Sequence, residues 1–400
     1  MTPATPSPAH NVPARGQMIG WLELFYDLVF VAAILVLSSA VSHLHDATKI
    51  TLVVAVFVSL WWIWLATTLF VDRHRVDDVP QQLLVLGQMF LVTVVAMEGH
   101  AGVVRDAQAL SVAYGLLVGS VAVMYWRVVR VEPSSEARRH ALLGALAAAM
   151  FVVAAFVPDP GRYVIWVVGA VVTVLATLGP ATERRSETAI DEHHLLERFG
   201  AFTIIVCGEA FVKVAIAVSD AHVDEIDIIA LAFQFVLTFV IWTSYFEDVP
   251  HAGIAARRRS SWVGLHLVLQ LAIAGTAIGV SQLVKTDPLE HVPAEDILEI
   301  TATLATVFLA LAFLGLCTRR SPARPLFLLR IGTTVAVVAT GVGCWLVPWI
   351  DVAEGVAALS VVAVVYSAVA YRFLGRTSVE ATSVDRPFGL SSRRSPFRRP

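Results

Sequence analysis

Ionisable side chains interrupt two of the apolar segments of this sequence. Glu23 and Asp27 lie in WLELFYDLVFVAAIL, residues 21–35, and their four-residue spacing puts both carboxylates on one face of a helix. Glu209 and Lys213 have the same spacing in a later segment. Charged side chains near the centre of a bilayer cost ~2.5–3.5 kcal/mol on insertion scales, so they are usually paired or functional. Residues of these types in this setting suit the movement of protons or small cations.

Each of these residues also has a purely structural interpretation. Glu23 lies near the start of its predicted helix, where the helix dipole favours an acid. Asp27 lies one turn deeper, and we expect it to face the interior of the helix bundle. Glu209 precedes Lys213 in the order that favours an intrahelical ion pair, so the two could neutralise each other. Alternatively, Lys213 could tune the acidity of Glu209 in a proton or ion relay.

Histidines supply weaker candidates. His266 lies near one end of an apolar segment, one turn from Gln270, and a lone histidine there is more often a packing or hydrogen-bonding residue than a ligand. His193 and His194 are adjacent in DEHHLLER, residues 191–198. Adjacent side chains on a helix point about 100° apart, which is a poor arrangement for chelation. We therefore interpret residues 191–198 as a connector that leads into the next apolar segment.

Motifs for cofactor chemistry are absent from the sequence. It has no Walker loop, no dinucleotide fingerprint and no HExxH pair, so no cofactor, no metal and no catalytic residue are predicted, and the sequence favours a function other than catalysis without deciding the question. Cys207, Cys317 and Cys344 are far apart and lie in or beside apolar segments, as packing residues do. The net charge of -3 gives no indication of a nucleic-acid partner.

Composition defines the elements that must position these residues. The chain is 57% hydrophobic and 15% charged, against roughly 25% charged residues in a soluble domain. Twelve apolar segments each approach the ~20 residues that a membrane-spanning helix needs. The predicted fold is therefore an all-α polytopic membrane protein with twelve transmembrane helices, and the lipid bilayer is its main partner. The segments are 22–42, 51–71, 82–98, 107–126, 141–157, 162–179, 199–218, 226–246, 262–284, 297–317, 327–348 and 353–373.

Arginine placement orients these segments. Alternate connections hold nearly all of the arginines, whereas the other connections hold only Lys49, Arg105, Arg162 and Lys285. Because cytoplasmic loops are rich in Lys and Arg, both termini are predicted to be cytoplasmic. The polar residues 1–20 lack the basic region and cleavage site of a signal peptide, and they and the basic tail 376–400 are predicted to be disordered.

An internal repeat is also indicated. Aligning Glu23 with Glu197 aligns Phe25 with Phe199, and aliphatic positions follow. We interpret residues 21–180 and 195–375 as two six-helix halves in parallel orientation. The alternative is that membrane helices resemble one another through composition alone.

Three blocks carry a family resemblance. ELFYDLVFVAAI near the start, ERFGAFTIIVCGE near the middle and GLHLVLQLAIAGTAIG at residues 264–279 resemble the bacterial low temperature requirement protein A (LtrA) family in order and spacing. The resemblance covers roughly residues 17–375. It implies a multi-pass protein of the bacterial inner membrane, in a family named for a growth defect in the cold, and it implies no known reaction. Within the third block, Gly275 and Gly279 form a small-xxx-small pair that favours tight helix packing.

Three classes of function remain open at this stage. The first is a secondary transporter or channel for protons or small cations, and its candidate pathway residues are Glu23, Asp27, Glu197, Glu209, Lys213 and His266. The second is a membrane-embedded lipid-handling enzyme with acids at one interface, such as Asp72, Glu247 and Asp248. The third is a structural or sensory membrane protein in which all embedded charges are paired. The substrate and a homo-oligomeric state are left open.

Overall fold

The described part of the chain is almost entirely helical. The computed structural model describes residues 20–41, 47–74, 76, 78–100, 106–178, 191–220, 225–246, 249, 252–284, 294–319, 324–347, 349–350 and 352–384. These residues form twelve α-helices and one short 3-10 helix, with no β-strand beyond an isolated bridge between Ile254 and Thr318. The α-helices are α1 (Trp21–Val41), α2 (Ala47–His74), α3 (Val79–His100), α4 (Ala107–Val131), α5 (Ser135–Ala154), α6 (Gly161–Leu178), α8 (Glu192–Asp220), α9 (Glu225–Phe246), α10 (Arg259–Leu283), α11 (Ala294–Cys317), α12 (Arg324–Leu346) and α13 (Val352–Val384).

The all-helical prediction is confirmed, and each helix overlaps one predicted apolar segment in the same order. The two largest differences from the predicted ends are in α8 and α13. α8 begins at Glu192, so most of the predicted connector 191–198 is helical. α13 continues to Val384, into the tail that was predicted to be disordered. The predicted ends were taken from the apolar runs. Because charged and polar residues can continue a helix beyond such a run, the helices extend further than predicted.

The outer surface has the character that a membrane requires. Ten of the described helices are long and apolar enough to cross a bilayer, and α6 and α9 contribute shorter apolar stretches over Gly161–Thr177 and Leu231–Phe246. Large apolar side chains such as Phe90, Phe239 and Val335 are 55–70% exposed on the outside of the bundle. Because lipid rather than water can cover such side chains, the fold is that of a polytopic membrane protein.

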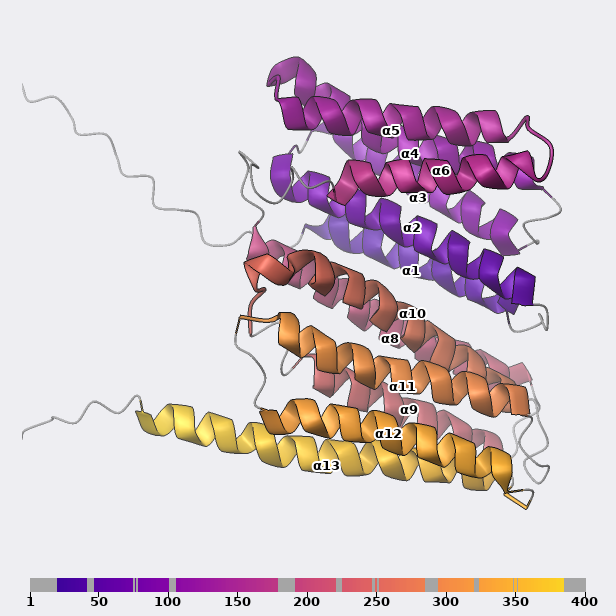
Figure 1. Ribbon diagram of the computed structural model, residues 1–400, viewed down its shortest axis with the longest axis vertical. Helices are drawn as coiled ribbons and strands as arrows, with labels where there is room; N and C mark the ends of the chain where they lie inside the picture. Colours follow the sequence, from indigo (N-terminus) through magenta and orange to yellow (C-terminus); the bar gives the residue numbers. More distant parts are fainter. Residues whose placement is uncertain are drawn as a thin grey trace, which may run out of the picture.

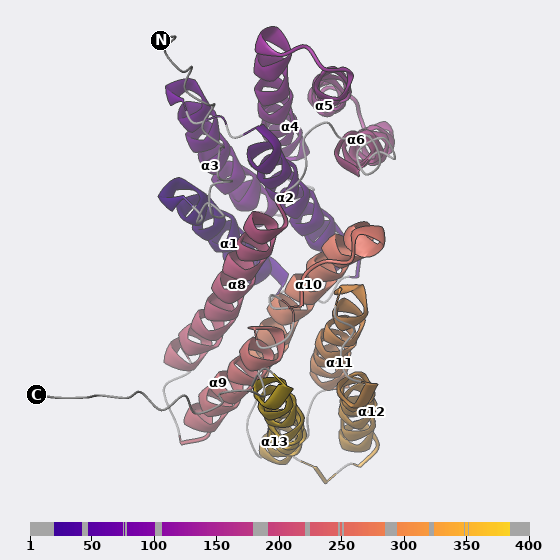
Figure 2. The ribbon, with the colours of Figure 1, turned by 90° about the vertical axis from the view of Figure 1, so that its left-hand side faces the viewer.

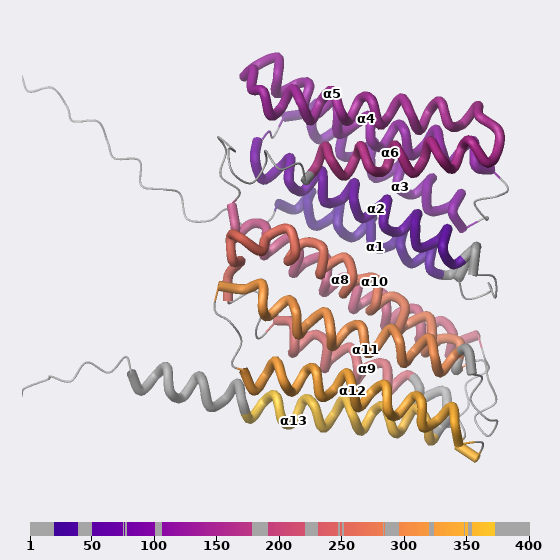
Figure 3. The backbone as a smooth tube through the Cα atoms, viewed as in Figure 1, coloured from indigo at the N-terminus to yellow at the C-terminus, as the bar shows by residue number. Residues whose placement is uncertain are grey.

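The helices form two groups that follow each other along the chain. α1 to α6 lie together in one half of the molecule, and α8 to α13 lie together in the other (Figure 1). Traced from indigo to yellow, the backbone completes the first group before it enters the second (Figure 3). The groups meet at the middle of the molecule, where α1 and α2 contact α8, and α1 also contacts α10 (Figure 2).

Aromatic side chains fill the junction between the two groups. The Trp64 ring of α2 packs against Phe199 and Phe202 of α8, with ring centroids 5.0 and 4.3 Å apart. Phe199 also packs edge-on against Trp262 of α10, at 4.8 Å. All four rings are fully buried. The aromatic cluster therefore joins three helices from both groups into one core and holds α8 firmly against α2.

Tight packing of α10 on α11 rests on two glycines, as the sequence predicted. A Cβ atom on Gly275 would lie 2.7 Å from Thr303 Cγ2, and a Cβ atom on Gly279 would overlap the Ile300 side chain. No side chain larger than hydrogen fits between the helices at either position. By contrast, Gly264 on the same helix has no neighbouring atom within 4 Å of a Cβ position.

Gly279→Ala should therefore lower the free energy of unfolding by about 1–3 kcal/mol, because the new methyl group forces α11 away from α10. Unfolding of the purified protein in detergent micelles measures this change. Gly264→Ala is the matched control on the same helix and should cost nothing, since its methyl group meets open space. Equal stability of the two variants would show that α11 can move away without cost.

Candidate functional site

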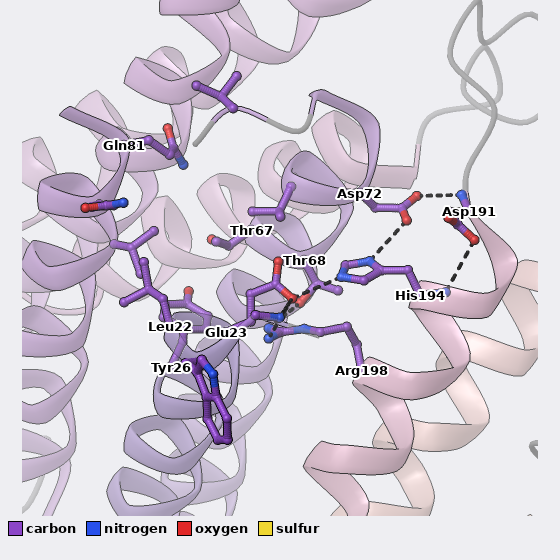
Figure 4. Close-up of a pocket in the computed structure, with 16 residues that line it drawn as sticks. Leu22, Glu23, Tyr26, Thr67, Thr68, Asp72, Gln81, Asp191, His194 and Arg198 are labelled. Carbon is purple, nitrogen blue, oxygen red and sulfur yellow. Dashed lines mark hydrogen bonds and ion pairs between the residues drawn. The ribbon is translucent and has the colours of Figure 1, made fainter. Parts of the chain in front are cut away.

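A cavity of about 360 Å³ lies at the end of the bundle where α1 and α8 begin and α2 ends. Its walls come from α1, α2, α3 and the first turns of α8, and they combine charged, amide, hydroxyl and apolar side chains (Figure 4). The lining residues are Gly20, Trp21, Leu22, Glu23, Tyr26, Thr67, Thr68, Val71, Asp72, Val76, Gln81, Gln82, Val85, Asp191, His194 and Arg198. The cavity thus lies where the two helix groups meet.

Arg198, which lines the cavity, forms a buried ion pair with Asp27, which is not a lining residue. Arg198 Nη2 is 2.8 Å from Asp27 Oδ1, and the two residues are 2% and 0% exposed. Trp64 Nε1 donates a hydrogen bond of 2.6 Å to the same carboxylate oxygen. Arg198 Nη2 also lies 3.3 Å from Thr68 Oγ1 and donates to it. Asp27 faces the bundle interior, as predicted, and Arg198 compensates its charge there.

A second set of charges lies closer to the helix ends. The His194 ring lies between two carboxylates, with Nε2 3.0 Å from Glu23 Oε2 and Nδ1 3.2 Å from Asp72 Oδ1. Asp72 Oδ2 accepts the backbone N–H of Asp191 at 3.0 Å. The Asp191 carboxylate in turn accepts the N–H groups of His193 and His194, the second of which is drawn in Figure 4. Asp191 therefore caps α8, and the first turn of α8 is tied to both α1 and α2.

The two levels of charge pairs arise because the acids on α1 and the basic residues on α8 have the same spacing. Glu23 and Asp27 are four residues apart on α1, and His194 and Arg198 are four residues apart on α8. Each pair occupies one face of its helix. Glu23 meets His194 and Asp27 meets Arg198, so the acidic pair and the basic pair align in the same direction. Arg198 Nη1 also lies 3.9 Å from Glu23 Oε2, which links the two levels.

Polar contacts extend from the cavity into the first helix group. Tyr26 Oη donates to Gln88 Oε1 at 2.9 Å, and Thr67 Oγ1 donates to the same oxygen at 3.2 Å. Gln88 Nε2 donates to Ser120 Oγ at 2.8 Å. Gln88 is fully buried on α3, and Ser120 belongs to α4. A chain of hydrogen-bonding side chains thus runs from the cavity wall through α3 to α4.

The wall formed by α3 is fixed by a surface arginine. Arg127 Nη1 donates to Gln81 Oε1 at 3.2 Å, and Arg127 Nη2 donates to both carboxylate oxygens of Asp78, at 2.8 and 2.6 Å. These hydrogen bonds from Arg127 lower the pKa of the Asp78 carboxyl. Asp78 also accepts the Gln81 backbone N–H, so α3 starts at a defined place beside the cavity.

Several buried polar atoms of the site lack a hydrogen-bond partner among the described residues. They are Asp27 Oδ2, Arg198 Nε and Nη1, and Gln81 Nε2. Such atoms are uncommon in buried surroundings because each costs free energy comparable to a lost hydrogen bond. Donors and an acceptor that are not saturated by the protein leave the site able to bind water or an ion next to the Asp27–Arg198 pair.

Three predicted candidates on α8 lie outside this cavity. Glu197 Oε1 contacts His193 Nδ1 at 3.3 Å, so Glu197 does not join Glu23. Glu209 and Lys213 are not lining residues, and at 1.5 Å per residue Glu209 lies about 16 Å along the helix from Arg198. Within the described part of the chain, no ion pair between Glu209 and Lys213 is seen. The roles of these residues stay predictions.

His266 lies in the aromatic core and not in the cavity. It is fully buried, its Nδ1 is 2.8 Å from the Trp262 carbonyl oxygen, and its Nε2 is 2.9 Å from Tyr245 Oη. The Phe199 ring packs against it at 4.8 Å. These contacts agree with the packing interpretation. Nearby Gln270 accepts from Trp61 Nε1 at 2.6 Å and joins α10 to α2.

Sequence reasoning missed two residues of the site, His194 and Arg198. The interpretation of residues 191–198 as a connector was wrong, because His194 and Arg198 lie on a helix and face the acids of α1. Their four-residue spacing, which equals that of Glu23 and Asp27, was the available signal. Asp72 was named from the sequence only as an interface acid of the lipid-handling alternative; it is 4% exposed and contacts His194. The remaining interface acids, Glu247 and Asp248, lie outside the described residues.

Fold and site together define a class of protein: a multi-pass helical membrane protein with a buried charged network at one end of its helix bundle. The family model for the bacterial low temperature requirement A protein (LtrA) matches residues 18–369, and the chain belongs to this family. It is also similar to an uncharacterized protein of Rhizobium meliloti (strain 1021), with 28% identity over 238 residues. That match covers 56% of this chain and 58% of the relative, so it spans little more than half of either protein.

Proposed function

We propose that the chain is a secondary transporter or channel that moves protons or small cations through the cavity between α1, α2 and α8. The observation that carries this proposal is the buried charged network itself. Three carboxylates, from Glu23, Asp27 and Asp72, surround two basic side chains, from His194 and Arg198. Charges that are embedded in a membrane protein and line a cavity are typical of proton and ion pathways.

A topology accompanies this proposal. We infer twelve membrane spans in two parallel six-helix halves, with both termini on the cytoplasmic side of the bacterial inner membrane. The arginine-rich alternate connections support this orientation, and the separation of α1–α6 from α8–α13 supports the two halves. The cavity would then face the cytoplasm at the junction of the halves, where many transporters hold their substrate.

The proposal predicts a flux that depends on the Asp27–Arg198 pair. The full chain is reconstituted into proteoliposomes, and proton, Na⁺ and K⁺ fluxes are measured per folded molecule. The double variant Asp27→Asn/Arg198→Gln removes both buried charges and leaves no single charge without a partner. We expect its flux to fall by about tenfold or more relative to the native sequence.

The matched control removes a partly exposed pair, outside the cavity, by the same two substitutions. Arg162 Nη1, in the first turn of α6, lies 3.3 Å from Asp159 Oδ1 at the other end of the bundle. Asp159→Asn/Arg162→Gln should therefore leave the flux unchanged. Absence of any flux from the native chain, or equal flux from both double variants, would overturn the proposal and favour a structural or sensory role.

A further inference from the structure

Both ring nitrogens of His194 face carboxylate oxygens. Nε2 lies 3.0 Å from Glu23 Oε2 on α1, and Nδ1 lies 3.2 Å from Asp72 Oδ1 on α2. A neutral imidazole has one N–H donor and one nitrogen lone pair, whereas an imidazolium has two donors. With a neutral ring, one of the two carboxylates would face a lone pair and be repelled. The two contacts are both favourable only when the ring carries a second proton.

We propose that His194 is a proton-binding site of this protein, and that the bound proton fastens the start of α8 to α1 and α2 together. The inference deepens the proposed function and rests on it for its use in transport, because it names the proton as an ion that the cavity binds. Binding adds one proton from water to the free lone pair of the neutral ring. Release returns that proton to water through the cavity and leaves a single donor for two acceptors.

The charged surroundings of the ring come from three helices. Glu23 of α1 and Asp72 of α2 contact it directly, and Arg198 lies one turn further along α8 and pairs with Asp27. The Asp191 carboxylate is engaged by the backbone N–H groups at the start of α8. When the His194 ring is neutral, Arg198 is the one remaining cation beside the carboxylates of Glu23, Asp27 and Asp72. One of the two contacts of His194 with α1 and α2 is then lost.

A change at His194 can reach the second helix group through its neighbour. Glu192, in the same turn of α8, accepts the Ile254 backbone N–H at 2.8 Å and pairs with Arg319. Ile254 precedes α10, and Arg319 directly follows the bridge residue after α11. The first turn of α8 is thus held by α1 and α2 on one side and by the ends of α10 and α11 on the other. If the contacts with α1 and α2 are weakened, the first turn of α8 can move together with the ends of α10 and α11.

Ring protonation can be observed directly by nitrogen NMR on the full chain in lipid nanodiscs, labelled with ¹⁵N-histidine. The spectral difference from His194→Gln assigns the ring, and exposed His193 serves as the adjacent reference. We expect His194 to carry protons on both nitrogens at about pH 5 and to lose one on titration through and beyond about pH 9, because both facing carboxylates favour the charged ring. A ring with a single protonated nitrogen over the whole range would overturn the proposal.

Attachment of α8 is followed by hydrogen–deuterium exchange of the peptide that contains residues 192–198, corrected for the pH dependence of intrinsic exchange. In the native chain, protection should fall about tenfold as the ring loses its proton. His194→Gln should show the low protection at every pH, and His194→Arg, with a fixed charge, the high protection at every pH. His193→Gln is the matched control and should behave like the native chain.

Protection that does not change with pH in the native chain, or that still changes in His194→Arg, would overturn the inference even if His194→Gln failed to fold. Neither the NMR titration nor the exchange measurement involves flux, so failure of this inference can be distinguished from failure of the proposed function. Flux without a titrating His194 contact would assign the proton or cation to other groups. A titrating contact without flux would leave a proton-binding site in a protein that does not transport.

Discussion

Replacing Arg198 by glutamine while Asp27 is kept should lower the free energy of unfolding by about 3–5 kcal/mol. The carboxylate would remain fully buried with the Trp64 N–H but without the cation that compensates its charge. Removal of one partner from a buried pair is costly because the other charge cannot return to water. Reversible unfolding in detergent micelles, monitored by tryptophan fluorescence, measures the loss.

The double variant provides the decisive comparison. Asp27→Asn/Arg198→Gln should recover most of the stability that either single variant loses, because no buried charge is left without a partner. The same cycle at the pair of Asp159 and Arg162 should show less coupling, since the Asp159 side chain is 50% exposed and that of Arg162 is 18% exposed, so water screens their interaction. Additive losses at Asp27 and Arg198 would mean that the two side chains stabilise the fold independently, which would contradict the pairing.

Arg330→Met is expected to have the second largest effect, a loss of about 2–4 kcal/mol. Arg330 lies on α12, is 1% exposed, and donates to the Ser244 carbonyl at 2.9 Å and to the Leu311 carbonyl at 3.0 Å. It also donates to Tyr366 Oη at 3.4 Å. One guanidinium thus joins α9, α11, α12 and α13. Methionine fills similar space but leaves both carbonyl oxygens without this donor.

The control for this prediction lies on the same helix. Arg324 is the first residue of α12 and is exposed, so Arg324→Met should leave the unfolding transition where it is. Arg330→Lys should retain only part of the stability, because an ammonium cannot reproduce the planar fork of donors. An Arg330→Met protein as stable as Arg324→Met would show that the four helices are held by apolar packing alone.

The helices were predictable from the sequence because membrane spans have a one-dimensional signal. A run of about 20 apolar residues is a property of the chain itself, and all twelve predicted segments correspond to helices in the same order. The burial of Asp27 was predictable for a similar reason, since an acid within such a run avoids lipid. Likewise, the spacing of Gly275 and Gly279 indicated close helix packing.

The start of α8 shows where this reasoning ends. Residues 192–198 have little apolar character, and a charged helical turn has the same composition as a charged loop. Only contact with α1 and α2 distinguishes them, because His194 and Arg198 gain their partners there. For the same reason, the intrahelical spacing of Glu209 and Lys213 suggested an ion pair that is not seen among the described residues.

The sequence by itself determined the class of this protein, the order of its helices and the two acids on α1 that share a face, because each depends on the chemistry of nearby residues in the chain. The tertiary structure decided which cations meet those acids. Glu23 and Asp27 are paired with side chains that lie far away along the sequence, on a helix of the other group. Such pairing depends on how whole helices pack, and the charges then stabilise the arrangement that the packing allows.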